Sequence, residues 1–113
     1  MSGKDFSELK PETQRILTEI KRVPFGAVSS YKDVAYRAGI INGARQVARA
    51  LHGLSDKHEL PWWRIIKADS RIGLTGNARQ EQIRLLRLED VEVTDTGRVL
   101  SAFWHGDDEL IEE

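Results

Sequence analysis

The sequence has 113 residues, of which 40% are hydrophobic, so it can form one domain with a modest core. It contains no cysteine, which excludes disulfides, thiolate metal sites and a cysteine nucleophile. The net charge of −1 hides an uneven distribution, since residues 21–88 hold thirteen basic and five acidic side chains and residues 103–113 hold five acidic and no basic ones. A basic middle favours an anionic partner, although charges that merely solvate the surface would give the same counts.

The sequence offers no pattern for a metal, a membrane or export. His52, His58 and His105 lie too far apart for a metal-binding motif. No apolar run approaches the roughly 20 residues of a membrane span, and the first ten residues carry no hydrophobic signal region. We therefore expect a cytoplasmic protein with no metal, cofactor or membrane partner. Residues 10–104 would form a single domain, followed by an acidic tail, 105–113, that is frayed from residue 107.

The first predicted element is a helix over residues 11–22. Pro11 suits the first helical position, and Ile16, Leu17 and Ile20 recur at helical spacing to mark a buried face. The Pro-Phe-Gly segment at 24–26 breaks this helix. Residues 27 and 28 are expected to form a short extended link.

Two further helices are predicted over residues 31–38 and 43–52. Ser29 or Ser30 can cap the first of them, with Asp33 placed to complete a variant of the capping box. A glycine at position 39 ends it, and Asn42 is expected to cap the second helix. Residues 44, 47, 48 and 51 form the apolar stripe of that helix, and a glycine at position 53 is expected to end it.

The pair of helices joined by a short glycine-containing turn is a helix-turn-helix pattern. Arg45, Gln46 and Arg49 lie away from the apolar stripe of the second helix, and Asn42 and Gly43 could offer backbone N–H groups to a phosphate. This pattern is compatible with DNA binding. On its own, the pattern is more often an ordinary helical hairpin that carries solvated arginines.

The second half of the chain is predicted to mix loops with short elements. Residues 54–60 read as a polar loop, and Ile65 and Ile66 as a short buried strand or an extended core segment. Residues 67–77 form a loop rich in small residues, and residues 78–89 a helix with Ile83 and Leu86 inward. Valines at 91, 93 and 99 flank a turn at 94–98, which predicts a hairpin.

Four segments together carry a family resemblance: GAVSSYKDVA (26–35), GARQVARAL (43–51), PWWRII (61–66) and IGLTG (72–76). In order and spacing they resemble the C-terminal domain of the O6-alkylguanine-DNA alkyltransferases, over residues 10–95. The resemblance implies a mainly α fold with short β segments, a winged-helix-like domain with a helix-turn-helix.

The reactive motif of the true enzymes is Pro-Cys-His-Arg, and Pro61-Trp62-Trp63-Arg64 stands in its place here. Tryptophan at the cysteine position marks the alkyltransferase-like subfamily, which usually has Pro-Trp-His-Arg, so Trp63 is a further departure. Indole is a hydrogen-bond donor without a nucleophilic lone pair, and Trp63 cannot relay a proton as histidine does. In this alignment the acidic member of the relay falls near Ile83, with Glu81 two residues away.

The resemblance also implies roles for individual residues. Arg45 would enter the base stack from the minor groove and replace a flipped-out alkylguanine, and Tyr31 would help to rotate the nucleotide. Trp62 would form an aromatic wall for the base, or else plug the former active site as part of the core. Arg64 would be structural, tying neighbouring loops together through backbone hydrogen bonds. The expected DNA-binding residues are Tyr31, Asn42, Gly43, Ala44, Arg45, Gln46 and Arg49, and the expected lesion pocket comprises Trp62, Gly73, Leu74 and Thr75.

The resulting prediction is a monomeric, non-enzymatic damage sensor with no catalytic residue. It would bind O6-alkylguanine in duplex DNA, flip the base and mark it for nucleotide-excision repair. One alternative is the family's cysteine-dependent alkyl transfer, which the absence of cysteine disfavours. Another is a generic helix-turn-helix protein that reads an undamaged sequence in the major groove.

Overall fold

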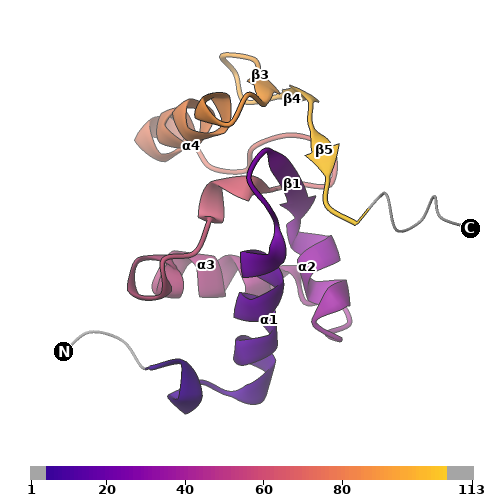
Figure 1. Ribbon diagram of the computed structural model, residues 1–113, viewed down its shortest axis with the longest axis vertical. Helices are drawn as coiled ribbons and strands as arrows, with labels where there is room; N and C mark the ends of the chain where they lie inside the picture. The colour runs from indigo at the N-terminus through magenta and orange to yellow at the C-terminus, as the bar shows by residue number, and fades with distance from the viewer. Residues whose placement is uncertain (1–4, 107–113) are drawn as a thin grey trace, which may run out of the picture.

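The computed structural model describes residues 5–106, which form four α-helices and five short strands (Figure 1). The α-helices are α1 (Pro11–Arg22), α2 (Tyr31–Arg37), α3 (Ala44–His58) and α4 (Gly76–Leu88). Two 3-10 turns, η1 (Phe6–Glu8) and η2 (Trp62–Arg64), precede α1 and the second strand. Within this range no helix combines the length and apolar character that a membrane crossing requires. The expected frayed tail, 107–113, lies outside the described residues.

A small parallel sheet joins distant parts of the chain. Its central strand, β1 (Ala27–Ser30), pairs with β2 (Ile65–Ile66) on one side and with β5 (Phe103–Trp104) on the other. Parallel neighbours need a long crossover, which α2 and α3 provide between β1 and β2. The other two strands, β3 (Glu92–Val93) and β4 (Val99–Ser101), form a separate antiparallel hairpin.

The sheet stands between two hydrophobic clusters, because successive side chains of a strand point to opposite faces. Ala27 and Ile65 belong to the cluster formed with α1, α2 and α3. Val28 and Ile66 belong to the cluster formed with α4 and the hairpin. In Figure 1, α4 and the hairpin accordingly lie at one end of the molecule and the other three helices at the opposite end.

Several local predictions are confirmed. The first helix spans residues 11–22 as expected. Ser30 caps α2, its side chain accepting a hydrogen bond from the Asp33 amide at 3.0 Å. Gly39 follows α2 with φ of +79°, the left-handed conformation of a helix-ending glycine. The hairpin turn at 94–98 is closed by the Thr94 amide, which donates to the Arg98 carbonyl at 2.9 Å.

The predicted end of the third helix is wrong. α3 continues through Gly53 to His58, so most of the expected polar loop at 54–60 is helical. A glycine inside a helix costs only about 1 kcal/mol relative to alanine, and packing can outweigh that penalty. Leu54 packs against the helical cluster one turn beyond Ala50, and Glu59, with φ of +53°, ends the helix instead. The buried stripe also differs, because Ala50 is buried and Ala48 is exposed.

The predicted cap of this helix is also wrong. Asn42 adopts a left-handed conformation, with φ of +55°, and Gly43 is the N-cap residue without any side-chain cap. A Cβ on Gly43 would lie 2.5 Å from Cγ2 of Ile40 and 3.1 Å from Cβ of Ala35. The close approach of the turn to α2 therefore requires glycine at this position, which shifts the helix start past Asn42.

One strand is longer than the sequence predicted, and another was not predicted. The link at 27–28 is part of the four-residue strand β1, and β5 has no counterpart among the predicted elements. β1 is buried at all four positions, including Ser29 and Ser30, so it shows no alternation of polar and apolar residues. A strand covered on both faces lacks the period-two pattern by which single sequences reveal strands.

Candidate nucleic-acid interface

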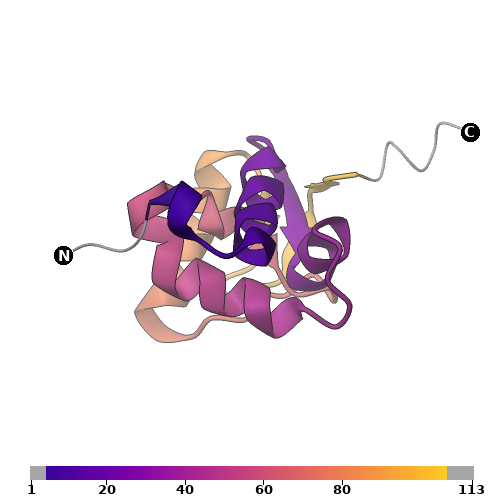
Figure 2. The ribbon, with the colours of Figure 1, turned by 90° about the horizontal axis from the view of Figure 1, so that it is seen from below.

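The helix-turn-helix consists of α2 and α3, which pack against each other and against α1 (Figure 2). Arg45 lies exposed at the start of α3. Ala48 follows three residues after Arg45, and His52 four residues after Ala48, so the three side chains share one face of the helix. This face leads from the exposed arginine toward a cavity beside the C-terminal half of α3.

The cavity has a volume of about 380 Å³ and lies between α2, α3, η2 and α4. Its walls are mostly apolar or aromatic, and are formed by Tyr31, Ala48, Leu51, Trp62, Leu74 and Ala78. Its polar lining consists of His52, Ser55, Asp56 and Gln82. A concave, mainly apolar site with a few polar groups suits a flat organic ligand such as a nucleobase.

Tyr31 connects the helix-turn-helix to this cavity. It is half-buried at the first position of α2 and lines the cavity. Burial raises the pKa of its phenol above the ordinary value, so the hydroxyl stays protonated and can donate a hydrogen bond.

The predicted residues at the start of α3 gather at a second, wider hollow of about 770 Å³. Asn42, Gly43, Ala44 and Arg45 all contribute to its lining. Beside them stands Ile41, a residue that is 90% exposed. The link between α2 and α3 and the first residues of α3, up to Arg45, therefore line one common surface.

Gln46 and Arg49 line a different hollow from the one that Arg45 lines. Gln46 is half-buried, and its Nε2 donates to Oε1 of Glu12 in α1 at 3.2 Å. Arg49 is exposed and shares with Gln46 a hollow that includes Lys10 and Glu12. The structure thus places these two residues at a separate hollow, although Arg49 stands one helical turn beyond Arg45.

The four residues predicted to form a lesion pocket divide in the same way. Trp62 and Leu74 line the 380 Å³ cavity, and both are half-buried. Gly73 and Thr75 belong to the same loop as Leu74, but they are exposed and lie outside the lining of the cavity. Thr75 is the N-cap residue of α4.

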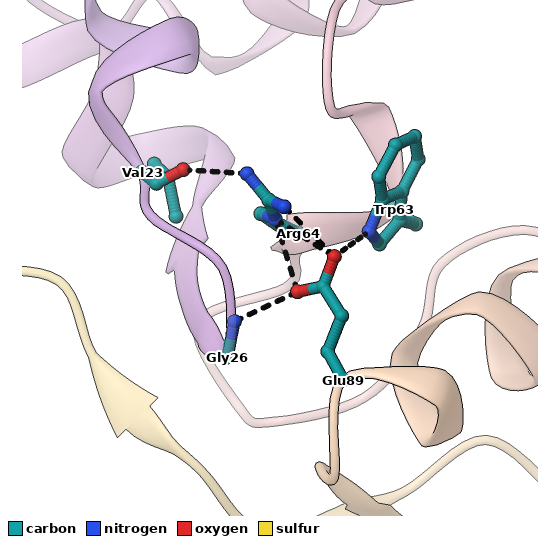
Figure 3. Close-up of polar contacts among 5 residues, drawn as sticks. All are labelled: Val23, Gly26, Trp63, Arg64 and Glu89. Atoms are coloured by element: carbon teal, nitrogen blue, oxygen red, sulfur yellow. Dashed lines mark hydrogen bonds and ion pairs between the residues drawn. The ribbon is translucent and has the colours of Figure 1, made fainter.

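A buried carboxylate, Glu89, holds Gly26, Trp63 and Arg64 together (Figure 3). Its Oε2 accepts hydrogen bonds from Nε1 of Trp63 at 2.7 Å and from Nη2 of Arg64 at 2.8 Å. Its Oε1 accepts from the Gly26 amide at 2.8 Å and from Nε of Arg64 at 3.0 Å. Arg64 also donates through Nη1 to the Val23 carbonyl at 3.0 Å. Arg64 therefore ties the loop after α1 to η2 and to the end of α4.

The sequence alignment predicts the acidic member of the relay near Ile83. The carboxylate that contacts Trp63 is instead Glu89, six residues further along the chain. Ile83 is buried in the second cluster, and Glu81 is exposed and pairs with Arg84 at 2.7 Å. A helix C-terminus carries partial negative charge and therefore disfavours an acid. Glu89 is the C-cap residue of α4, and this unfavourable position is the sequence feature that could have identified it.

The charge state of Glu89 follows from two opposing effects. Burial alone would raise the pKa of its carboxyl group. The hydrogen bonds from Arg64, Gly26 and Trp63, together with the charge of Arg64, outweigh burial and hold the pKa below the ordinary value. Glu89 is therefore a carboxylate at neutral pH, and the Trp63 indole is held as its donor.

Gln82 is a second buried polar residue that the sequence did not reveal. It is 1% exposed, and its Nε2 donates to the carbonyls of Trp63 and Ile65, both at 3.1 Å. These two acceptors fix the orientation of the amide. Its Oε1 is buried and has no hydrogen-bond partner within residues 5–106, and Gln82 lines the cavity beside Trp62.

Comparison with known proteins agrees with this arrangement. Residues 11–91 match the family model described as the DNA-binding domain of 6-O-methylguanine DNA methyltransferase. The chain is 35% identical over 85 residues to a DNA base-flipping protein of Vibrio parahaemolyticus, and this alignment covers 75% of this chain and 85% of the relative. It is 31% identical over 84 residues to alkyltransferase-like protein 1 of Schizosaccharomyces pombe, covering 73% and 78%.

A solved structure extends the agreement to the fold. The structure of S. pombe Atl1 in complex with damaged DNA containing O6-carboxymethylguanine aligns with a TM-score of 0.69 and 27% identity. The alignment covers 81% of this chain and 89% of that one. The predicted fold class, mainly α with short β segments and of the alkyltransferase type, is confirmed by this match.

Proposed function

The chain belongs to the 6-O-methylguanine DNA methyltransferase family through its DNA-binding domain, and we propose that it is a damage sensor that flips O6-alkylguanine out of duplex DNA without repairing it. One observation carries this proposal. An apolar cavity with an aromatic wall, Trp62, lies beside a helix-turn-helix whose exposed Arg45 shares a helix face with the residues leading into the cavity.

The energetics of base flipping fit the residues present. Extruding a base costs a few kcal/mol of lost stacking and pairing, and less for a damaged base that pairs poorly. Arg45 is long, permanently charged and planar at its tip, so it can fill the vacated stack from the minor groove. Tyr31 lines the cavity with a neutral phenol that can donate to the displaced nucleotide.

The remaining DNA contacts are proposed along the start of α3 and its neighbouring faces. Asn42, Gly43 and Ala44 would meet the phosphate backbone, since Gly43 and Ala44 allow close approach and the helix start attracts anions. Gln46 and Arg49 would contact the adjoining phosphates.

Within the cavity, Trp62 and Leu74 would pack against the flipped base and its alkyl group, gaining apolar contact. Gly73 and Thr75 would close over the base from the loop before α4, and Arg64 would keep its structural role behind this surface. We propose no catalytic residue. The sequence has no cysteine, and neither Trp62 nor Trp63 has a lone pair suited to nucleophilic attack or proton relay.

The decisive experiment compares two duplexes that differ only in one O6-methylguanine. We expect the lesion duplex to bind more tightly, and Arg45→Ala to weaken lesion binding more than undamaged binding. Arg84→Ala is a matched control, because Arg84 is an exposed arginine of α4 whose partner is Glu81. Equal affinity for both duplexes would sink the proposal, and affinity that follows base sequence and ignores the lesion would indicate a generic helix-turn-helix protein.

Inherited alkyl transfer is tested separately with DNA that carries a radiolabelled alkyl group. We expect no label on the protein, and covalent labelling would contradict the proposed absence of chemistry.

The proposed function also suggests a repair partner, an oligomeric state and a cellular location. A sensor without chemistry needs a repair system, and we propose nucleotide-excision repair machinery as its partner. We further propose that the protein acts as a cytoplasmic monomer with one domain over residues 10–104, followed by an acidic tail. Lesion-dependent co-purification with excision-repair proteins, together with the solution mass, tests these points.

A further inference from the structure

The charge of the cavity has a consequence for the adducts it can accept. Among the described residues that line the cavity, none is lysine or arginine. Asp56 contributes a carboxylate at its rim, one helical turn beyond His52 on the same face of α3. Of these described lining residues, His52 is the one whose side chain can carry positive charge, so they supply no permanent cation.

Two further polar groups of the lining favour a donor over an anion. Oε1 of Gln82 is a buried acceptor with no partner in the described part of the chain, and its orientation is fixed by the two carbonyls that accept from Nε2. The hydroxyl of Ser55 donates to the Leu51 carbonyl at 2.5 Å, so its proton is already committed. An adduct that brings another carboxylate would meet an acidic rim and a free acceptor.

We propose that this cavity selects neutral O6-alkyl adducts and rejects carboxylate-bearing ones, with Asp56 as the residue that sets the selection. The inference rests on the proposed lesion binding and adds the substrate class. The contrast with Atl1 is direct, since that protein was crystallised with O6-carboxymethylguanine, an adduct that ends in a carboxylate.

The test uses three duplexes of identical sequence that carry O6-methylguanine, O6-(2-hydroxyethyl)guanine or O6-carboxymethylguanine. Hydroxyethyl and carboxymethyl groups are close in size, so their comparison separates charge from bulk. We expect the carboxymethyl duplex to bind on the order of tenfold more weakly than the hydroxyethyl duplex, because an adduct carboxylate in the cavity and Asp56 are like charges that repel at the dielectric constants of protein surfaces.

Asp56→Asn should remove most of that discrimination while leaving the fold intact, because Asp56 is exposed and the change is isosteric. Removing any acid raises affinity for all DNA, but this general effect cancels in the ratio of the two duplexes. Glu92→Gln is the matched control, since it removes one exposed acid on β3, outside the cavity lining.

Each outcome is decisive. Equal binding of hydroxyethyl and carboxymethyl duplexes by the native protein would overturn the charge selection while leaving lesion sensing intact. A ratio that Asp56→Asn changes no more than Glu92→Gln would remove Asp56 from the role. Binding of the methyl duplex no better than undamaged DNA would instead refute the proposed function, and the selection with it.

Discussion

Replacing Glu89 by glutamine should destabilise the protein severely, because Glu89 accepts hydrogen bonds from three residues in two other segments. The change keeps the shape of the side chain but turns one acceptor oxygen into an NH₂ group. That group would face the N–H groups of Trp63, Arg64 or Gly26, which now converge on two carboxylate oxygens. It also leaves the Arg64 guanidinium, whose side chain is 15% exposed, without a counter-charge.

The size of the effect follows from burial. Removing one partner of a fully buried ion pair costs about 3–5 kcal/mol of unfolding free energy. Arg64 keeps its hydrogen bond to the Val23 carbonyl and its position over the rings of Phe25 and Trp63, at 5.9 and 5.4 Å. Because these contacts and its partial exposure soften the loss, we expect Glu89→Gln to cost about 2–4 kcal/mol.

Urea unfolding at neutral pH, followed by tryptophan fluorescence, measures this loss. Glu81→Gln is the control, since Glu81 is an exposed acid of the same helix that pairs with Arg84 within one turn. It should leave the urea midpoint unchanged. A Glu89→Gln midpoint indistinguishable from that of Glu81→Gln would refute the view that this carboxylate holds the three segments together.

The pH dependence supplies an independent check with a fixed sign. The pKa of Glu89 is lower in the folded protein than its ordinary value. Its contribution to stability is therefore complete above the ordinary carboxyl range and is lost as the pH falls through the folded pKa. The stability gap between the native protein and Glu89→Gln should shrink on acidification below about pH 4, and a gap that stays constant there would contradict the assignment.

Three further predictions concern Arg45, the glycines of α3 and Trp62. Arg45→Ala should reduce the affinity for a lesion duplex by about tenfold, with a smaller loss on undamaged DNA, as measured by fluorescence anisotropy; equal losses on both would mean that Arg45 acts only as a phosphate contact. Gly43→Ala should lower stability by about 1–3 kcal/mol because its Cβ would crowd Ile40. Gly53→Ala, whose added Cβ has no neighbour within 4 Å among the described residues, should raise stability by about 0.5–1 kcal/mol. Thermal unfolding compares the two variants, and stability changes of the same sign would contradict the different roles given to these glycines. Trp62→Cys should acquire no alkyl group from alkylated DNA, as judged by intact mass, because Trp63 cannot activate a thiol; an added alkyl mass would show that the neighbouring base is dispensable.

Local signals in the sequence predicted most of the helical framework. Pro11 at a helix start, Ser30 as a cap and Gly39 in a left-handed conformation act through their own backbone, so the sequence alone reveals them. The hairpin at 91–101 follows for the same reason, since alternating valines flank a turn whose bonds are local.

The errors arose where contacts distant in sequence decide the structure. Gly53 reads as a stop signal, but packing of the following turn carries the helix onward. Asn42 reads as a cap, but the close approach of Gly43 to α2 moves the helix start. Glu89 was missed as the partner of Trp63 because the two lie 26 positions apart and meet only through the fold.

The candidate site shows the same division. The resemblance singled out Arg45 and Trp62 by position. The rim residue Asp56 was invisible, because the sequence placed it in a loop and the structure places it on α3, facing the cavity.

The sheet also governs the order in which this chain can fold. Its central strand, β1, pairs with β2, which follows two helices later in the chain. It also pairs with β5, where Ala27 lies opposite Phe103 near the far end of the described chain. Such distant pairing raises the contact order, which predicts slower folding than for an all-helical domain of similar length. During synthesis, one edge of β1 stays unpaired until Phe103 has left the ribosome, whereas α1, α2 and α3 can already assemble. The helix-turn-helix should therefore be the first part to form, and that open strand edge the segment most exposed to misassembly.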